Sequence, residues 1–146
     1  MASKHDYLKY WRVIKYYYKR KYNLSESDLE MLLFLNSEGR FRRKDFRKYA
    51  EIMPWDRTRF DRLVKDGWIQ EFNNTTSTWN MRYQLSSKAE RMIISLYKKL
   101  NGEEIPTSQS FNPMFAKNVS YTDKVYRNMI KEMNEFIRQQ RHSSPQ

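Results

Sequence analysis

The sequence that decides the fold is PWDRTRFDRLVKDGWIQEF, residues 54–72. Phe60, Leu63 and Val64 recur in it at the spacing of one helical face, so they are predicted to form the buried side of a short helix. Gly67 follows at a position where a residue in the left-handed conformation commonly ends a helix. The stretch therefore predicts a helix that ends just before an apolar segment begins.

Two starts of this helix are compatible with the sequence. With Asp56 as the N-cap, Trp55 becomes a hydrophobic staple that packs against Phe60. With Pro54 in the first turn, the helix begins earlier, and Trp55 lies on its exposed face beside the arginines. The residue pattern leaves both starts open, and with them the role of Trp55.

The opposite face of this helix carries cations. At about 100° per residue, Thr58, Arg59 and Arg62 lie away from the buried side, with Lys65 at the edge of this face and Arg57 nearer the core. Such a face could read bases in a major groove, or it could be the solvated face that most charged helix surfaces are. The surrounding motif favours the DNA interpretation.

Two apolar runs after the helix predict a β-hairpin. The first run is residues 68–72. The second, residues 79–85, alternates strictly, with one side formed by Trp79, Met81, Tyr83 and Leu85. The connecting residues 73–78 contain no cation, so this tip is expected to add little to DNA binding. Arg82, on the polar side of the second run, is a further candidate DNA contact.

Helices are predicted on both sides of this region. After the hairpin, Ser86 or Ser87 caps a helix, and Ser87 and Glu90 have the spacing of a capping box. The apolar face of that helix is expected to contain Ala89, Met92, Ile93, Leu96, Tyr97 and Leu100. Upstream, the sequence LSESDLEMLLFL, residues 24–35, predicts a helix whose first turns hold acidic partners for its dipole, namely Glu26, Asp28 and Glu30.

The segments RLVKDGWI, residues 62–69, and YQLSSKA, residues 83–89, follow each other in the order seen in MarR-type regulators. Together with residues 24–35, they make the chain resemble this family over residues 24–100. The resemblance implies a homodimeric transcriptional regulator whose recognition helices enter successive major grooves of DNA. It also implies that the first and last helices of two subunits interlock.

The net charge of +11 is unevenly distributed. Residues 1–24 carry seven basic groups and one acidic group, and residues 39–65 carry ten and four, whereas residues 25–38 carry four acidic groups and no basic one. Two basic blocks favour a polyanionic partner, because each neutralised phosphate releases condensed counterions. In the second block, the predicted anchors for the DNA backbone are Arg42, Arg43, Lys44 and Arg47.

The first basic block, residues 1–24, has the pattern of an amphipathic helix. Its apolar stripe is predicted to consist of Tyr7, Trp11, Ile14 and Tyr18. Three interpretations compete: a dimerisation or core helix, a membrane-surface helix, and a stacking platform for single-stranded nucleic acid that also uses Tyr10, Tyr16 and Tyr17. Packing is favoured, because an aromatic stripe at helical spacing usually packs.

Residues 120–140 predict a second amphipathic helix, which starts near Ser120 or Thr122. Its seam is expected to contain Tyr126, Met129, Ile130, Met133, Phe136 and Ile137. The first helix could cover this seam, but the resemblance to MarR-type regulators favours cover by a second subunit. The predicted dimerisation residues are Tyr7, Trp11, Ile14, Tyr18, Tyr126, Met129, Met133 and Phe136.

The connection of residues 101–119 has no periodic pattern and is unusually long. Loops longer than about 12 residues without secondary structure tend to be functional or disordered. Phe111 and Phe115 indicate that this loop docks either on its own core or, over residues 103–119, on a protein partner. Residues 141–146 are expected to form a disordered tail.

Catalytic chemistry is not predicted. The chain has no cysteine, which excludes disulfides, thiolate metal sites and thiol nucleophiles, and its two histidines, His5 and His142, lie near the termini. No metal cluster or cofactor motif is apparent. No apolar run approaches the roughly 20 residues of a membrane span, and the first residues have no signal-peptide core, so a cytoplasmic protein without a membrane partner is expected.

The sequence thus predicts a mainly helical α+β fold with a small β-hairpin wing. It would be a winged helix-turn-helix over residues 25–100, flanked by N- and C-terminal dimerisation helices. The predicted function is that of a non-enzymatic transcriptional regulator that binds specific sequences of double-stranded DNA through a helix in the major groove. Two alternatives stay open: a winged-helix module that binds a protein in a transcription or viral assembly, and a binder of single-stranded nucleic acid.

Overall fold

The computed structural model describes residues 7–53, 56–73 and 81–143, without the side chains of Tyr7, Asn73 and Ser143. The chain divides into two compact units. We call residues 25–94 the central unit, and residues 1–24 together with residues 95–146 the terminal unit. One helix, α5, begins in the central unit and ends in the terminal unit.

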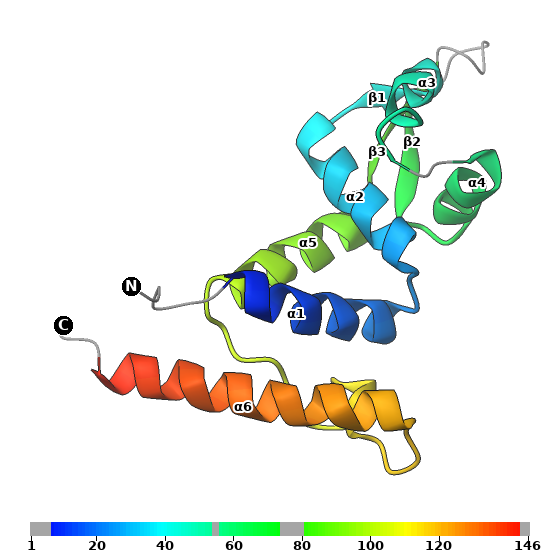
Figure 1. Ribbon diagram of the computed structural model, residues 1–146. Coiled ribbons are helices and arrows are strands. Elements are labelled where there is room, and N and C mark those ends of the chain that lie inside the picture. The colour runs from blue at the N-terminus through cyan, green and yellow to red at the C-terminus, as the bar shows by residue number, and fades with distance from the viewer. Residues whose placement is uncertain (1–6, 54–55, 74–80, 144–146) are drawn as a thin grey trace. The chain divides into compact units, whose positions relative to one another are not determined.

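Figure 1 shows the elements of both units. The central unit contains α2 (Glu26–Glu38), β1 (Phe41–Arg42), the 3-10 helix η1 (Arg43–Asp45), α3 (Phe46–Tyr49), α4 (Arg57–Lys65), β2 (Ile69–Asn73), β3 (Arg82–Leu85) and most of α5 (Ser87–Leu100). The terminal unit contains α1 (Tyr7–Tyr22), the end of α5, the 3-10 helix η3 (Pro113–Phe115) and α6 (Tyr121–Ser143). The predicted α+β class, mostly helical with a small antiparallel sheet, is confirmed.

Within the described residues the strands form one antiparallel sheet of three strands, in the order β1-β3-β2. The predicted pairing of the two apolar runs is confirmed, with Ile69 opposite Leu85 and a register shift between Glu71 and Asn73. Strand β1 was not predicted, because two residues are too few to show alternation. It places Arg42 directly opposite Arg82.

Capping side chains fix where the helices of the central unit begin. Ser25 caps α2 by accepting the Asp28 backbone N–H at 3.1 Å, and the Asp28 carboxylate accepts the Ser25 N–H in return. Asp56 caps α4 by accepting the Arg59 N–H at 2.7 Å. Of the two predicted starts of α4, the one with Asp56 as N-cap is therefore confirmed. Trp55 and its predicted staple lie outside the described residues.

The core of the central unit is aromatic. Phe60 and Leu63 of α4 are buried as predicted, and Val64 is half-buried. The Phe60 ring lies 4.5 Å from the Phe46 ring and 4.9 Å from the Tyr83 ring, measured between centroids. The Phe60 and Tyr83 rings meet edge to face, and the Phe46 ring is tilted against Phe60. These contacts join α3, α4 and β3 and so fix which side of α4 faces outward.

Helix α5 is capped by Ser86, whose hydroxyl accepts the Ala89 N–H at 3.2 Å and donates to the Gly67 carbonyl at 2.6 Å. Ser87 is therefore the first helical residue and not the cap. The predicted apolar face is buried at four positions, Ala89, Met92, Ile93 and Leu96. Tyr97 was wrongly assigned to this face, since half of its surface is exposed.

In the terminal unit, α1 and α6 pack side by side in antiparallel directions (Figure 1). Three pairs define this packing: Tyr10 with Phe136, Tyr16 with Tyr126, and Arg20 with Asp123. The Tyr16 and Tyr126 rings are parallel, with centroids 3.9 Å apart. The buried face of α1 consists of Tyr10, Val13, Ile14, Tyr17 and Tyr18, which corrects the predicted stripe.

The predicted dimerisation residues are mostly used inside the single chain. Ile14, Tyr18 and Met133 have 0%, 0% and 2% of their surface exposed, so they cannot form an interface without unpacking the unit. Two others, Tyr126 and Phe136, contact aromatic rings of α1. Trp11 and Met129 are half-buried, and the side chain of Tyr7 is outside the described part. Within one chain α1 covers this seam, and the assignment of the seam to a dimer interface stays a prediction.

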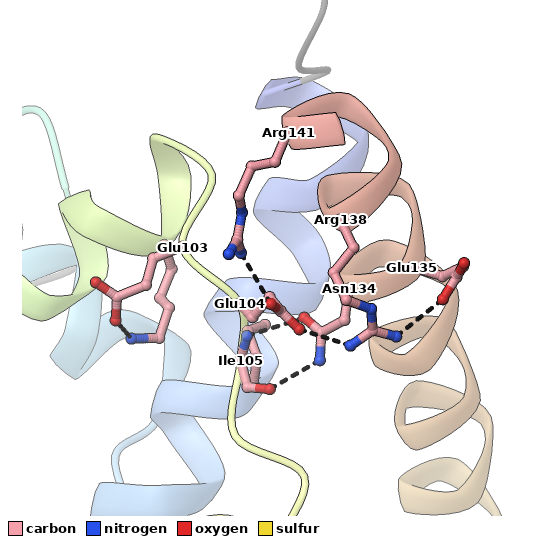
Figure 2. A network of polar contacts seen from close by, with 8 residues as sticks. Glu103, Glu104, Ile105, Asn134, Glu135, Arg138 and Arg141 are labelled. Atoms are coloured by element: carbon pink, nitrogen blue, oxygen red, sulfur yellow. Dashed lines mark hydrogen bonds and ion pairs between the residues drawn. The ribbon is translucent and has the colours of Figure 1, made fainter. Parts of the chain in front are cut away.

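The 101–119 connection docks on its own unit. Ile105 and Met114 are buried, and Pro113–Phe115 form η3. The Asn134 side chain of α6 accepts the Ile105 N–H at 2.9 Å and donates to the Ile105 carbonyl at 2.8 Å, as Figure 2 shows. Of the two phenylalanines expected to dock the loop, Phe115 is half-buried in η3, whereas Phe111 is 62% exposed.

Ion pairs add to this attachment of the loop to α6 (Figure 2). Glu104 accepts from Arg138 at 2.7 Å and from Arg141 at 2.8 Å, both on α6. Glu103 accepts from Lys99, near the end of α5. Helix α6 continues to Ser143, so residues 141–143 are helical and the predicted disordered tail was too long.

Candidate nucleic-acid interface

Helix α4 presents cations on the face opposite its aromatic core. Arg57, Thr58 and Lys65 are exposed, and the Arg57 side chain retains 76% of its accessible surface. Its Nε lies 3.7 Å from the Asp61 carboxylate one turn later. An exposed pair of this kind is worth little in water, so Arg57 remains available to a stronger anion.

Two predicted base contacts, Arg59 and Arg62, are held by a buried carboxylate. Asp28 of α2 is 4% exposed, and it accepts two bonds from Arg62 Nη2, at 2.7 and 2.8 Å. Arg59 Nε lies 3.3 Å from the same carboxylate. Both arginines lie away from the Phe60 and Leu63 side, but the pairing with Asp28 leaves only 23% of the Arg59 side chain and 48% of the Arg62 side chain exposed.

Asp28 has more than the predicted role of a helix-dipole partner. It completes the capping box of α2 and also joins α2 to α4. Charge-assisted hydrogen bonds of this type are stronger than neutral ones. Sequence reasoning missed the pairing because 34 residues separate Asp28 from Arg62, and no local pattern indicates which carboxylate a cation meets.

Arg43, a predicted backbone anchor, is also engaged within the protein. Its Nη2 lies 3.3 Å from the Asp61 carboxylate, its side chain is only 16% exposed, and its guanidinium carbon is 5.6 Å from the Phe60 ring centre. The nearby Tyr83 phenol is buried, which raises its pKa, so it stays protonated at neutral pH. Arg43 thus stabilises the core edge more than it offers a free charge.

Three other predicted DNA contacts meet at a pocket on the sheet edge. Arg42, Lys44 and Arg82 line a pocket of about 420 Å³, together with Arg40, Phe41 and Asp45. Arg40 is not among the predicted site residues; its guanidinium carbon lies 3.7 Å from the Phe72 ring centre. The sequence signal for it was the basic run of residues 40–44 itself. We call Arg40, Arg42, Lys44 and Arg82 the sheet-edge pocket cations.

The remaining predicted anchor, Arg47, is exposed on α3 and does not line this pocket. The DNA-binding prediction therefore separates into distinct groups: the exposed face of α4, the sheet-edge pocket cations, and Arg47. Counted over the sequence, the central unit carries 13 basic and 11 acidic residues, whereas the terminal unit carries 15 and 6. The positive character of the central unit is local, because its basic residues concentrate at positions 40–65.

The tyrosines of α1 that a stacking platform for single-stranded nucleic acid would use are engaged inside the terminal unit. Tyr10 and Tyr17 are buried, and Tyr16 lies against Tyr126. Burial raises the pKa of Tyr16 and Tyr17 to about 12, and for Tyr16 the hydrogen bond to Asp123 adds to this effect. These phenols are therefore protonated donors inside the protein, and their rings are not free to stack on bases.

Within the part of the chain that the structure describes, no group of three or more His, Cys, Asp or Glu side chains is placed to hold a metal ion. No described helix is long and apolar enough to cross a membrane. Comparisons with protein-family models, with curated proteins and with solved structures found no match.

Proposed function

We propose that the central unit is a winged helix-turn-helix that binds double-stranded DNA as a regulator of transcription. The observation that carries the proposal is α4, which buries Phe60 and Leu63 and leaves Arg57, Thr58 and Lys65 exposed. The order α2, β1, α3, α4, β2, β3, with β3 between the other strands, supports it because a winged helix has this order. A helix held in this way can enter a major groove.

In this proposal, Arg57, Thr58 and Lys65 make the first contacts with DNA. Arg62 contributes less than a free arginine would, because its Nη2 is bound to Asp28. Its Nε and Nη1 donors remain for a base edge or a phosphate. Arg47 and the sheet-edge pocket cations would contact the DNA backbone, which orients the protein but carries no sequence information.

Fluorescence anisotropy of the full chain tests the proposal, with a labelled random-sequence duplex and the corresponding single strand, at two salt concentrations. We expect tighter binding to the duplex and weaker binding at higher salt, because phosphate contacts release counterions. Selection from a randomised duplex pool then tests for sequence preference, which is expected if α4 reads base edges.

A matched pair of variants locates the binding surface. Arg57→Gln with Lys65→Gln removes two cations from α4, and Arg91→Gln with Lys124→Gln removes two exposed cations from other helices. We expect the α4 variant to lose about tenfold in duplex affinity, or about 1.4 kcal/mol, and the control to lose much less. Equal losses of affinity in the two variants would show that only the net charge of the protein matters. Absence of duplex binding by the wild-type protein would overturn the proposal.

A second candidate function is the binding of a protein partner through the 101–119 loop. One observation favours it: Phe111 exposes 62% of its surface, although Ile105 and Met114 of the same loop are buried. A large exposed aromatic side chain is a typical anchor of protein interfaces. This alternative predicts that Phe111→Ser abolishes capture of the partner and leaves the duplex titration unchanged.

A further inference from the structure

We propose that the sheet-edge pocket, lined by Arg40, Arg42, Lys44 and Arg82, is a built binding site for a phosphoryl group. The group is either a backbone phosphodiester of nucleic acid or a free phosphate, and both present the same oxygens to the pocket. Only the first source rests on the DNA-binding function proposed above. The site lies on β1, η1 and β3, separate from the exposed face of α4.

The pocket has a surplus of positive charge. Its lining contains four cationic side chains and a single carboxylate, that of Asp45. This carboxylate already accepts the Arg42 backbone N–H at 2.8 Å. Throughout residues 7–53, 56–73 and 81–143, no carboxylate oxygen lies within 4.0 Å of the charged nitrogens of these four cations. This contrasts with Arg43, Arg59 and Arg62, each of which has a carboxylate partner.

The sheet register brings two of these cations together. Arg42 and Arg82 are Cα partners on β1 and β3, so they stand directly opposite each other. Like charges at such positions repel each other and destabilise the sheet. An anion between them would turn this repulsion into two charge-assisted hydrogen bonds. The arrangement therefore costs stability in the free protein and favours a bound anion.

The side chain of one pocket cation, and the backbone that carries two others, are held in place before a ligand arrives. Arg40 lies over the Phe72 ring at 3.7 Å, a cation–π contact that restricts its side chain. Phe41 and Phe46, on either side of η1, are 2% and 1% exposed, so the backbone that carries Arg42 and Lys44 is anchored in the core. Preorganised charges lose less side-chain entropy when they bind.

The chemistry of the lining selects the ligand. A guanidinium presents planar pairs of donors that match the oxygens of a phosphoryl group, and three of the four cations are arginines. A pocket of about 420 Å³ exceeds what a single phosphate group fills, so a diphosphate or a stretch of phosphodiester backbone also fits. The lining is mostly polar, since the one apolar residue among those that line it, Phe41, is buried.

The test uses the full chain and inorganic diphosphate as the probe. Arginine side-chain NMR signals are followed during the titration, in wild type, in Arg42→Gln with Arg82→Gln, and in the control Arg91→Gln with Lys124→Gln. We expect wild type and control to show saturable shifts of the Arg40, Arg42 and Arg82 signals, and the pocket variant to lose saturation. The same three proteins are then titrated with duplex DNA at several salt concentrations.

The duplex arm distinguishes the two sources of phosphate. If the DNA backbone occupies the pocket, log K falls less steeply with log salt in the pocket variant, by about one unit of slope. The control changes this slope less. An unchanged slope with lost diphosphate binding supports the site and assigns it to a free phosphate. If the protein binds diphosphate but not DNA, the proposed phosphoryl site stands and only the proposed DNA-binding function is overturned.

Folding is checked separately. Because the double substitution removes a like-charge pair, we expect its melting temperature to equal or exceed that of wild type. Lys44→Gln, which leaves both strands untouched, serves as a second variant if the first fails to fold. The proposal is overturned if diphosphate causes no saturable shift in wild type, or if the pocket variants bind it as wild type does.

Discussion

At the scale of single residues, Asp28 decides how much positive charge α4 offers. Its carboxylate caps α2 and binds both Arg59 and Arg62, although it is almost completely buried. An acidic residue on one helix thus offsets part of the basic face of another. Stability and nucleic-acid affinity are expected to depend on this side chain in opposite directions.

We predict that Asp28→Asn lowers the free energy of unfolding by about 1–3 kcal/mol, the usual cost of lost hydrogen bonds to a charged partner. The same change frees Arg59 and Arg62 and adds one positive charge, so duplex affinity should rise if the proposed function holds. Urea unfolding and the anisotropy titration measure the two effects. Glu30→Gln, an exposed acidic position on the same helix, is the matched control.

The two outcomes of this experiment separate two questions. An Asp28→Asn protein as stable as the Glu30→Gln protein would show that the buried pairing contributes nothing to folding. A destabilised protein with unchanged duplex affinity would show that the two arginines do not take part in binding. Only lower stability combined with tighter binding agrees with both parts of the prediction.

At the scale of elements, Asp123 joins α6 to α1. Its carboxylate accepts two bonds from Arg20, at 3.0 and 2.9 Å, and one from the Tyr16 hydroxyl. Burial disfavours the charged carboxylate, but the hydrogen bonds from Arg20 and Tyr16 outweigh burial, so the pKa of Asp123 lies below its ordinary value. The folded state therefore holds Asp123 ionised at a pH where the unfolded chain protonates it.

This difference predicts an acid-sensitive contribution to stability. The contribution is fully present above the ordinary carboxyl pKa, near 4, and it is lost as the pH falls through the lower pKa of the folded state. Urea unfolding between pH 7 and pH 2 should show a steeper decline for wild type than for Asp123→Asn. Glu132→Gln, at an exposed position on α6, should follow wild type. Parallel curves for wild type and Asp123→Asn would contradict the prediction.

Elements with a local signature were predictable from the sequence. The buried face and the N-cap of α4 follow from the spacing of Phe60 and Leu63 and from Asp56, and the pairing of β2 with β3 follows from alternation. Strand β1 was not predictable because its two residues acquire their conformation by pairing with β3. The docking of loop 101–119 was not predictable either, because the loop has no periodic pattern and is anchored by Asn134, a residue of another element.

The residue types of the candidate site were predictable from the sequence, but the ion pairs between them were not. Basic residues at positions 40–47 and 57–65 identify the charged surface. Which of them are neutralised depends on tertiary contacts, such as those of Arg43 with Asp61 and of Arg62 with Asp28. Charge counting along a sequence cannot separate an arginine that has a carboxylate partner from one that faces solvent.

At the scale of the whole molecule, the packing of the terminal helices bears on the oligomeric state. An amphipathic stripe requires a cover, and from the sequence alone a second subunit was the favoured one. In the structure, α1 covers α6 within one chain, with Ile130 and Met133 of α6 buried and Phe136 against Tyr10. The apolar seam therefore supplies no reason for a dimer, and light scattering is expected to give the mass of one chain, 18.1 kDa.

Substitutions on the seam distinguish cover by α1 of the same chain from cover by a second subunit. We predict that Met133→Lys with Phe136→Lys destabilises the folded chain by about 3 kcal/mol or more, because lysine at a buried position must lose its hydration or its charge. Thermal unfolding followed by circular dichroism measures this loss. The control is Thr122→Lys with Asn128→Lys, which adds the same charge at exposed positions of α6 and should melt close to wild type. If wild type is instead a dimer and the seam variant is a monomer that melts as wild type does, then the seam joins two subunits and the packing of α1 on α6 within one chain is wrong.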